Sequence, residues 1–317
     1  MARAIRRIAV AAAMAAVAFA LWLGFVWPPP SWWRTHWPAR TAFMAMRARQ
    51  AGAGPRAPAL RYTPVPADSM SPWLPKAATA GEDEAFYLHH GIDYRAVREA
   101  LGYRRLSFAW NSAADRAELW RALGRAWARR DRLRGASTIT QQLAKNLYLS
   151  PSRNPLRKLK EAAIAYRLER ALGKGRILAL YLNVAEFGPN LWGVQAAGEA
   201  YFGRGARHLS ADQAAMLVAT LPHPLTSNPA YRPGRTRWRQ QLILLKLGGA
   251  PVIVPPEETE DTISAPPPGL LDTMPGADSL PLDTLPPLND TAAVPLLPRD
   301  TAAAPPTKAP PAAPHRR

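Results

Sequence analysis

An uncharged apolar stretch near the N-terminus limits where the rest of this chain can fold. Residues 8–27 contain no charged side chain and are almost wholly apolar. A helix of about 20 such residues spans the hydrocarbon core of a bilayer. The stretch therefore predicts a transmembrane anchor over residues 8–27, with the remainder of the chain beyond it.

The residues around this stretch give it a direction. Arg3, Arg6 and Arg7 precede it, and by the positive-inside rule they hold residues 1–7 in the cytoplasm. Indole rings prefer the membrane interface, and tryptophans gather toward the far end: Trp22, Trp27, Trp32, Trp33 and Trp37. A cleavable signal peptide is the competing interpretation, because Ala16-Val17-Ala18 and Ala18-Phe19-Ala20 resemble cleavage sites. The apolar run continues past both, which favours a retained anchor, and either interpretation exports the remainder.

The chain is strongly basic, with a formal net charge of +18 over 317 residues. Such a balance implies an anionic partner or a membrane surface, although arginine used in place of lysine explains part of it. We find no nucleic-acid fingerprint and no zinc-finger spacing, so no nucleic-acid partner is expected. Cysteine is absent, which excludes disulfides, zinc–thiolate sites and thiol nucleophiles.

Composition divides the exported part into three segments. Residues 28–75 are rich in Pro and Ala and predict a juxtamembrane linker, with a short helix near 41–50. Residues 76–249 are the expected folded domain. Residues 250–317 are dominated by Pro and carry little aromatic content. Because such a segment cannot bury enough surface to offset its ordering entropy, we expect a disordered tail.

Within the domain, apolar residues recur mostly at helical spacing. Helices are expected over 94–101, 157–172, 177–184, 193–202, 214–221 and 235–247, with a loop over 186–190. Ser210 and Gln213 form a capping box before one of these helices. Little strand pattern is present, so the sequence predicts an all-α fold.

The segment 106–134 is strongly basic and carries Trp110, Trp120 and Trp127 along with a helical apolar stripe. A basic amphipathic helix of this kind can lie on anionic lipid. An ordinary packed helix with a solvated basic face explains the same pattern, and the sequence does not separate the two interpretations.

A short stretch over residues 81–93 combines side chains that neither a surface nor a core requires together. It holds Glu82, Asp83 and Glu84 beside Phe86, two imidazoles and two glycines. A core rejects unpaired carboxylates because burying an ionised group is costly, and a solvated surface does not need the aromatic rings. The mixture suits a cleft in which a carboxylate exchanges a proton. A polar helix end is the alternative interpretation.

Residues 135–147 predict the start of a helix that can bind an anion. Ser137 or Thr138 can cap this helix, and the free amides of a helix start bind phosphate well. Gln141 and Lys145 are four residues apart and share one face. Caps and polar faces are common in helical proteins, so this signal is moderate by itself.

The helix that follows presents a carboxylate inward. By their spacing, one face holds Arg157, Glu161, Ile164, Ala165, Leu168 and Leu172. Glu161 therefore faces the core with a cation one turn before it. A structural ion pair with Arg157 explains this pattern, and so does a cleft that holds a second charged carboxylate in place.

These segments occur in an order that resembles one family, and the resemblance covers roughly residues 76–249. The matching motifs are Glu82-Asp83-x-x-Phe86 with His89, Gly91 and Asp93; Gly135-x-Ser137-Thr138-Ile139-Thr140-Gln141-Gln142 with Lys145 and Asn146; Arg157-Lys158-x-x-Glu161; Ile177-Leu178 with Tyr181-Leu182-Asn183, Gly188 and Gly193; and Ala214-Ala215-x-Leu217 with Leu221-Pro222 and Pro224. The chain resembles the monofunctional peptidoglycan glycosyltransferases, whose catalytic domain also occurs in bifunctional penicillin-binding proteins. The resemblance implies a lysozyme-like helical domain.

The chain departs from the family pattern in three places. Ala85 stands where the family often has a basic residue, and Ala179 where it often has Glu. The segment 94–134 is longer than usual. No Ser-x-x-Lys and Lys-Thr-Gly pair follows the domain, so no transpeptidase activity is expected.

The resemblance implies a reaction and roles for the residues. Lipid II, an undecaprenyl pyrophosphate that carries a muropeptide disaccharide, would be polymerised into β-1,4 glycan strands with release of undecaprenyl pyrophosphate. Glu82 would be the base for a sugar 4-hydroxyl, and Glu161 the second essential carboxylate. The leaving pyrophosphate would be stabilised by the helix start and cations at Ser137, Lys145, Arg153, Arg157 and Lys158. Residues that shape the site would be Asp83, Phe86, Gln142 and Asn183.

The resemblance also implies surroundings for the reaction. Glu161 would either orient the cations just named or assist a divalent metal, Mg or Mn, at the pyrophosphate, and no organic cofactor is expected. His89 is expected to be structural, because a lone histidine pair gives too few ligands for a metal. The partners would be lipid II, the growing glycan chain, the membrane, and cell-division or elongation proteins. The enzyme would be single-pass in the inner (cytoplasmic) membrane, with its catalytic domain in the periplasm.

Two other functions remain open from the sequence. A lytic, lysozyme-like enzyme would cleave glycan with one protonated Glu, although the basic side of the expected site argues against it. A catalytically silent scaffold of the cell-wall machinery is the other, because Ala85 and Ala179 depart from the family pattern.

Overall fold

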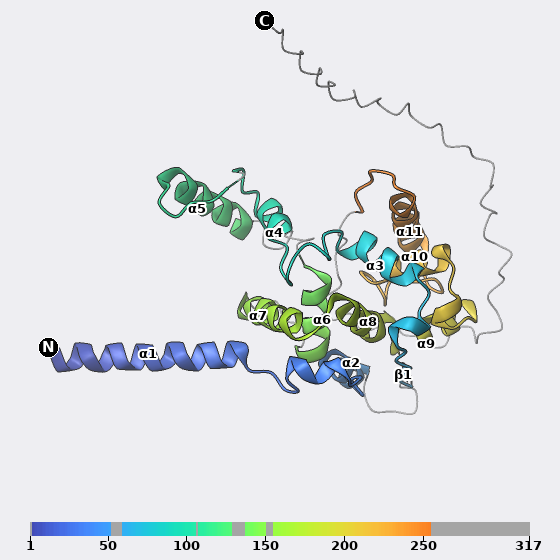
Figure 1. The fold of residues 1–317 in the computed structure, drawn as a ribbon, viewed down its shortest axis with the longest axis horizontal. Coiled ribbons are helices and arrows are strands. Elements are labelled where there is room, and N and C mark those ends of the chain that lie inside the picture. Colours follow the sequence, from blue (N-terminus) through green and yellow to red (C-terminus); the bar gives the residue numbers. More distant parts are fainter. Residues whose placement is uncertain (1, 52–58, 106, 129–136, 150–154, 255–317) are drawn as a thin grey trace, which may run out of the picture. The chain divides into compact units, whose positions relative to one another are not determined.

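The computed structural model describes residues 2–51, 59–105, 107–128, 137–149 and 155–254 (Figure 1). These residues are mostly helical, as the sequence predicts. The α-helices are α1 (Ala2–Gly24), α2 (Ala42–Ala51), α3 (Trp73–Glu82), α4 (Tyr94–Leu101), α5 (Ala113–Ala128), α6 (Ile139–Tyr148), α7 (Pro155–Ala171), α8 (Lys174–Val184), α9 (Val194–Phe202), α10 (Ala211–Thr220) and α11 (Gly234–Leu247). Short 3-10 helices are η1 (Pro30–Arg34), η2 (Ala67–Ser69) and η3 (Ala206–His208), and the strands are β1 (Arg61–Tyr62), β2 (Glu186–Gly188) and β3 (Leu191–Trp192).

Helix α1 contains the expected membrane span. The segment Ile5–Gly24 is 20 residues long and apolar enough to cross a membrane, and none of its most apolar window is buried against the protein. The helix ends at Gly24, three residues before the end of the apolar run, and the prolines Pro28, Pro29 and Pro30 follow. The chain therefore has an N-terminal helix suited to anchor it in a membrane.

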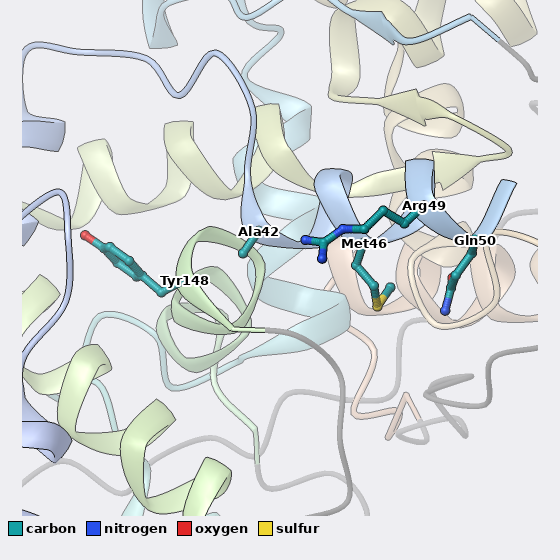
Figure 2. Close-up of a pocket in the computed structure, with 5 residues that line it drawn as sticks. All are labelled: Ala42, Met46, Arg49, Gln50 and Tyr148. Atoms are coloured by element: carbon teal, nitrogen blue, oxygen red, sulfur yellow. The ribbon is translucent and has the colours of Figure 1, made fainter. Parts of the chain in front are cut away.

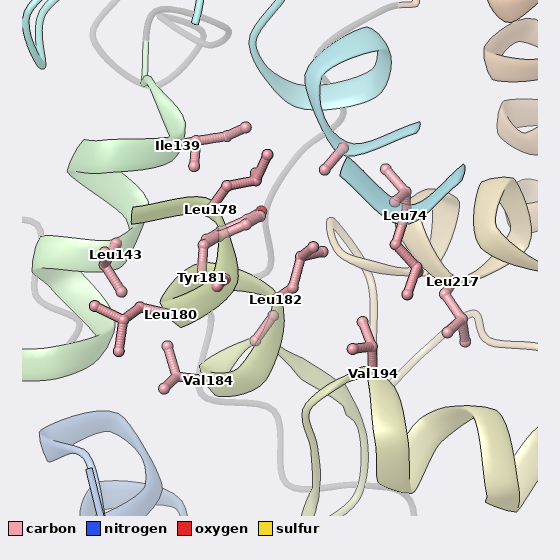
Figure 3. Close-up of a cluster of buried hydrophobic side chains, with 14 of the residues drawn as sticks. Leu74, Ile139, Leu143, Leu178, Leu180, Tyr181, Leu182, Val184, Val194 and Leu217 are labelled. Carbon is pink, nitrogen blue, oxygen red and sulfur yellow. The ribbon is translucent and has the colours of Figure 1, made fainter. Parts of the chain in front are cut away.

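The core is built around α8, which is buried on every side from Ile177 to Val184. A helix that is apolar all round must be covered on all faces. Figure 3 shows Leu178, Leu180 and Leu182 of α8 among side chains of α3, α6, α9 and α10. Beside this cluster, α7 buries Ile164, Ala165 and Leu168, the face that the spacing predicts. The core thus fixes α3, α6 and α7, which carry residues of the first three motifs.

The helix start before α6 is capped as a reciprocal box. Thr138, rather than Ser137, is the N-cap: its hydroxyl accepts from the amide of Gln141, and the Gln141 side chain accepts from the amide of Thr138. The Gln141 side chain therefore caps the start of its own helix and does not act together with Lys145. The capping box of Ser210 and Gln213 also forms, at the start of α10.

Helix α3 is not among the helices expected from the sequence. Pro75 and Gly81 interrupt its pattern, since both residues are poor helix formers. Proline is nevertheless tolerated in the first turn, where its missing N–H has no intrahelical partner. Glu82 is the last residue of α3, so the stretch 81–93 is a helix end as well as a candidate site.

Residues 28–51 and 59–75, in the segment expected to be a juxtamembrane linker, contribute to the core. Trp33, Met44 and Met70 are buried in the main apolar cluster, and the indole N–H of Trp33 donates to the Tyr148 hydroxyl at 2.6 Å. These buried residues do not recur at helical or strand spacing and are separated by prolines, so the sequence pattern does not predict that they are buried. The short helix expected near 41–50 is present as α2, which packs on α6.

A small sheet is the other departure from the expected all-helical domain. Its order is β1-β3-β2, with β1 parallel and β2 antiparallel to β3. Strand β2 lies in the segment 186–190 that was expected to be a loop. Strands of two or three residues are too short to show an alternating pattern. The sheet ties residues near Arg61 to the segment after α8.

Two expected segments fall partly outside the described residues. In the basic segment 106–134, α5 begins at Ala113, and residue 106 and residues 129–134 are not described. Of the tail expected over 250–317, only 250–254 are described.

Candidate active site

Glu82 is held by a partner on each carboxylate oxygen. Its Oε1 accepts from Nη2 of Arg239 at 2.8 Å, and its Oε2 accepts from Nε2 of Gln142 at 2.9 Å. Gln142 is oriented in turn by the Tyr181 hydroxyl, which donates to its Oε1 at 2.9 Å. A carboxylate has about four lone-pair sites, so each oxygen of Glu82 still has a site for a further donor. The network fixes where Glu82 can meet a proton.

Tyr181 is suited to this task because it stays protonated. Burial raises its pKa well above 10.0, and the negative charge of Glu82 raises it further. The phenol therefore remains a donor to Gln142 over the ordinary pH range.

Arg239 is a site residue that the sequence analysis did not identify. Its side chain is 2% exposed, and besides Glu82 it donates to the carbonyl of Gly81 at 2.7 Å. Gly81 allows α3 to pack closely against α10 and α11, because a Cβ at this position would lie 2.9 Å from Val218 of α10 and 3.0 Å from Ile243 of α11. Its place in α11 could have identified it: Arg239 lies on the buried face of this helix, where a cation needs an acidic partner.

Asp83 joins the first motif to the start of α6. It accepts from Nε2 of His89 at 3.0 Å and from the backbone N–H of Ile139 at 2.9 Å. The amide of Gly91 donates to Nδ1 of His89. Because a backbone N–H can only donate, Nδ1 is the unprotonated nitrogen and Nε2–H points at Asp83. Both ring nitrogens are engaged, which leaves none for a metal and agrees with the structural role expected of His89.

Glu161 is buried on α7 and paired with two cations. Arg157 Nη1 donates to its Oε2 at 2.8 Å, and Lys158 Nζ donates to its Oε1. Lys158 also donates to the hydroxyl of Ser137 at 2.7 Å, and about half of its side chain stays accessible. Glu161 thus makes the ion pair that the spacing suggested and also holds a second, accessible cation in place.

The two carboxylates are both attached to the beginning of α6. Gln142 contacts Glu82, whereas Ser137, just before the helix, contacts the Lys158 that pairs with Glu161. A helix rises about 1.5 Å per residue, so Ile139 and Gln142 are about one turn apart. The beginning of α6 therefore contacts Glu82 through Gln142, and Ser137 just before it contacts the Lys158 that pairs with Glu161.

The remaining predicted residues support the site or lie apart from these contacts. Phe86 is fully buried, with Lys174 Nζ 4.4 Å from its ring centre. Asn183 is fully buried and bonds the backbone of Val65 and Ala179 through its amide, so it shapes the fold and does not face the site. Lys145 lies on α6 with its Nζ 6.0 Å from the ring centre of Phe43. Arg153 lies outside the described residues.

The donor set fits a protein-bound divalent metal poorly. Among the described residues, no group of three or more His, Asp or Glu side chains lies close enough together to hold one. Glu161, the expected ligand, has one oxygen on Arg157 and the other on Lys158. A metal at Glu161 would lie beside both of these cations and would be repelled by their positive charge.

A pocket of about 430 Å³ lies between α2 and the C-terminal end of α6, away from the predicted site residues. Figure 2 shows its lining residues, Ala42, Met46, Arg49, Gln50 and Tyr148. None of them belongs to the network of Glu82 or Glu161. The pocket is therefore separate from the cluster at the start of α6.

Comparisons with known proteins agree with this arrangement of motifs. The model of the family described as Transglycosylase matches residues 105–248. A biosynthetic peptidoglycan transglycosylase of an Azoarcus species is 37% identical over 213 residues, which cover 67% of this chain and 83% of the relative. Relatives of the same name from Bordetella pertussis (39% over 223 residues, 70% of this chain and 83% of the relative) and Escherichia coli O81 (40% over 190 residues, 59% and 69%) are similar as well.

Proposed function

The chain belongs to the family of biosynthetic peptidoglycan transglycosylases, and on that premise we propose that it polymerises lipid II into β-1,4 glycan strands with Glu82 as the catalytic base. It is a peptidoglycan glycosyltransferase by this membership. The observation that supports the residue roles is the pairing of Glu82 with Arg239 and with Gln142 of α6, together with the cation on Glu161 that contacts Ser137 just before the same helix.

In the proposed step, a sugar 4-hydroxyl attacks the anomeric carbon of the lipid-linked sugar. The hydroxyl proton passes to the carboxylate of Glu82, the new C–O bond forms with inversion, and the bond to the pyrophosphate breaks. Glu82 suits this task because its partners fix its direction and leave lone pairs for the incoming hydroxyl. Pairing with Arg239 suits an ionised base, and not the protonated acid of a lytic enzyme.

The leaving undecaprenyl pyrophosphate carries the negative charge that develops in this step. Lys158 is placed to meet it, because it is accessible and is held by both Glu161 and Ser137. Arg157 and the amides at the start of α6 add positive potential on the same side. We assign Glu161 the role of orienting these cations, and Arg153 stays a predicted contributor.

A divalent metal at the pyrophosphate stays a proposal. If Mg or Mn takes part, Glu161 is the protein carboxylate nearest the task and would supply one ligand, with the charge of the metal adding to that of the cations. Because the donor set fits a metal poorly, we route no step through it. Polymerisation in the presence and absence of a chelator tests the requirement.

We place the catalytic domain in the periplasm, carried by a single span of the inner membrane. The apolar part of α1 and the arginines Arg3, Arg6 and Arg7 at the start of this helix support this orientation. A tether in the bilayer that holds the substrate raises the effective concentration of enzyme and substrate. Cell-division or elongation proteins are proposed partners, and they can be sought by crosslinking in cells.

Helix α5 is proposed to touch lipid headgroups. Trp120 on this helix and Trp110 just before it are exposed, at 72% and 75%, which favours the lipid-facing interpretation over an ordinary packed helix. Replacing the arginines of α5 by serine should weaken liposome binding of the protein. Unchanged binding would discard this role.

The product distinguishes the proposed function from the alternatives. Full-length protein incubated with labelled lipid II should yield polymeric glycan, and it should release no fragments from preformed glycan. Fragments from polymer with no product from lipid II would establish the lytic function, and no product from either would leave a scaffold.

A further inference from the structure

Helix α7 has an outer face that the reaction does not use. Leu156, Leu159 and Tyr166 lie on it and are 45%, 53% and 50% exposed. Cations share this face by helical spacing: Lys160, Arg167 and Arg170. It points away from the buried side that carries Glu161. We call these six residues the outer face of α7.

The end of the membrane span touches this outer face. Lys160 Nζ lies 4.4 Å above the ring centre of Trp22, and Arg167 Nη1 donates to the carbonyl of Gly24. Trp22 and Gly24 belong to the last turn of α1. Lys160 and Arg167, two turns apart on α7, therefore lie at the same depth in the membrane as the C-terminal end of α1.

A second set of contacts grips the C-terminal end of α7. Arg34, ten residues after the end of α1, donates through Nε to the carbonyl of Ala171 at 2.7 Å. Arg176 of α8, the next helix, donates to the carbonyls of Trp33 and His36 at 2.7 and 2.8 Å. The end of α1 and the segment after it thus contact α7 at several positions along its length, so the arrangement does not depend on a single side chain.

The length of the span sets the depth. The uncharged part of α1, Ile8–Gly24, has 17 residues, and at about 1.5 Å per residue a helix of this length is just long enough to cross a hydrocarbon core of roughly 30 Å. Gly24 therefore sits at the boundary between acyl chains and headgroups. Since Arg167 and Lys160 contact this end, the outer face of α7 lies at the level of the headgroups.

We propose that the outer face of α7 is a second membrane-contact surface that binds anionic phospholipid. Leu156, Leu159 and Tyr166 enter the boundary of the acyl chains, where an apolar or amphipathic side chain is favoured. Lys160, Arg167 and Arg170 extend their charged ends to lipid phosphates, as long cationic side chains do at interfaces. The contact is continuous with the anchor and separate from α5.

Contact of the outer face of α7 with the membrane would fix the distance between the candidate active site and the lipid headgroups. The inner face of the same helix carries Glu161 and Lys158, and a helix with its side chains is about 10 Å across. The cations would then lie about one helix diameter from the headgroups, where the pyrophosphate of a bilayer-bound lipid is found. This consequence rests on the proposed function, whereas the membrane contact itself does not.

Site-specific fluorescence tests the contact directly. The chain has no cysteine, so Leu159→Cys in the full-length protein can carry a single environment-sensitive fluorophore. Arg207→Cys, at an exposed position of η3, is the matched control. Both are reconstituted in phosphatidylcholine vesicles with and without phosphatidylglycerol, and quenching by a nitroxide lipid labelled near the headgroup is measured.

The fluorophore at position 159 should emit at shorter wavelength and be quenched severalfold more than the one at position 207, and more strongly when phosphatidylglycerol is present. Equal quenching at both positions would overturn the proposal. A blue shift at 159 without nitroxide quenching would overturn it too, because a second copy or another protein would then cover the face. No lipid II is used, so this result is independent of whether the protein polymerises it.

Discussion

Removal of the Arg239 guanidinium should destabilise the protein far more than removal of other arginines on the same helix. Arg239→Met leaves Glu82 largely buried, with Gln142 as its side-chain partner among the described residues, and also removes the donor to the Gly81 carbonyl. Breaking a buried ion pair by removing one partner costs about 3–5 kcal/mol. At roughly 2–4 °C per kcal/mol for a domain of this size, the melting temperature should fall by roughly 6–20 °C.

The assay is thermal unfolding in detergent, followed by circular dichroism at a fixed scan rate. Arg237→Met is the matched control, because Arg237 is exposed on the same helix. An exposed substitution of this kind should change stability by no more than about 0.5 kcal/mol. If Arg239→Met melts like Arg237→Met, the buried pair does not hold Glu82 in place.

A double variant separates pairing from general damage. In Glu82→Gln with Arg239→Met, the charge on each side is gone, so the combined loss should be smaller than the sum of the two single losses by about 1–3 kcal/mol. Strictly additive losses would refute the coupling between Glu82 and Arg239 and leave Arg239 as a packing residue alone.

The other predictions concern the second carboxylate, the loop anchor and one buried phenol. Glu161→Gln weakens the hold on Lys158 and should lower the rate of lipid II polymerisation by about 10²–10³-fold; a rate within twofold of wild type would contradict its role. Asp83→Asn cannot accept from both His89 and the Ile139 amide as a carboxylate does, so it should lose roughly 1–3 kcal/mol in thermal unfolding, and an unchanged melting temperature would argue against this anchor. Burial raises the pKa of Tyr62 to about 12, and its hydroxyl has no hydrogen-bond partner among the described residues. The raised pKa means that its contribution to stability is present below the unfolded value of 10.0 and is lost as the pH rises through 12. Tyr62→Phe should therefore match wild type in melting temperature below pH 10 and exceed it above, and a parallel alkaline loss in both proteins would contradict this.

Local sequence patterns predicted those parts of the site that depend on neighbours along the chain. The spacing of α7 placed Glu161 inward with Arg157 one turn before it, and the structure shows this pair. The helix start at residues 137–138 was expected, although the choice of Thr138 over Ser137 needed the geometry of the cap. The helix-end interpretation of the stretch 81–93 is confirmed, because Glu82 ends α3, whereas the interpretation as a cleft for proton exchange stays a prediction.

Contacts between distant segments could not be predicted in the same way. Arg239 and Glu82 are 157 residues apart in the sequence. The helices that carry them pack closely because Gly81 has no side chain. Trp33 and Met44 are buried individually, with no period that would mark them as core. Arg34 donates to a backbone carbonyl of α7 and Arg176 of α8 donates to the carbonyl of Trp33, and contacts with backbone carbonyls cannot be predicted from the pattern of side chains.

The central claim is that Glu82 is the base of the glycosyl transfer, and one comparison tests it most directly. Glu82→Gln and the control Glu84→Gln, which alters an exposed carboxylate two residues along, are assayed on labelled lipid II below their melting temperatures. We expect Glu84→Gln to polymerise at the wild-type rate and Glu82→Gln to lose at least about 10²-fold. A folded Glu82→Gln protein that polymerises lipid II as fast as wild type would contradict the account.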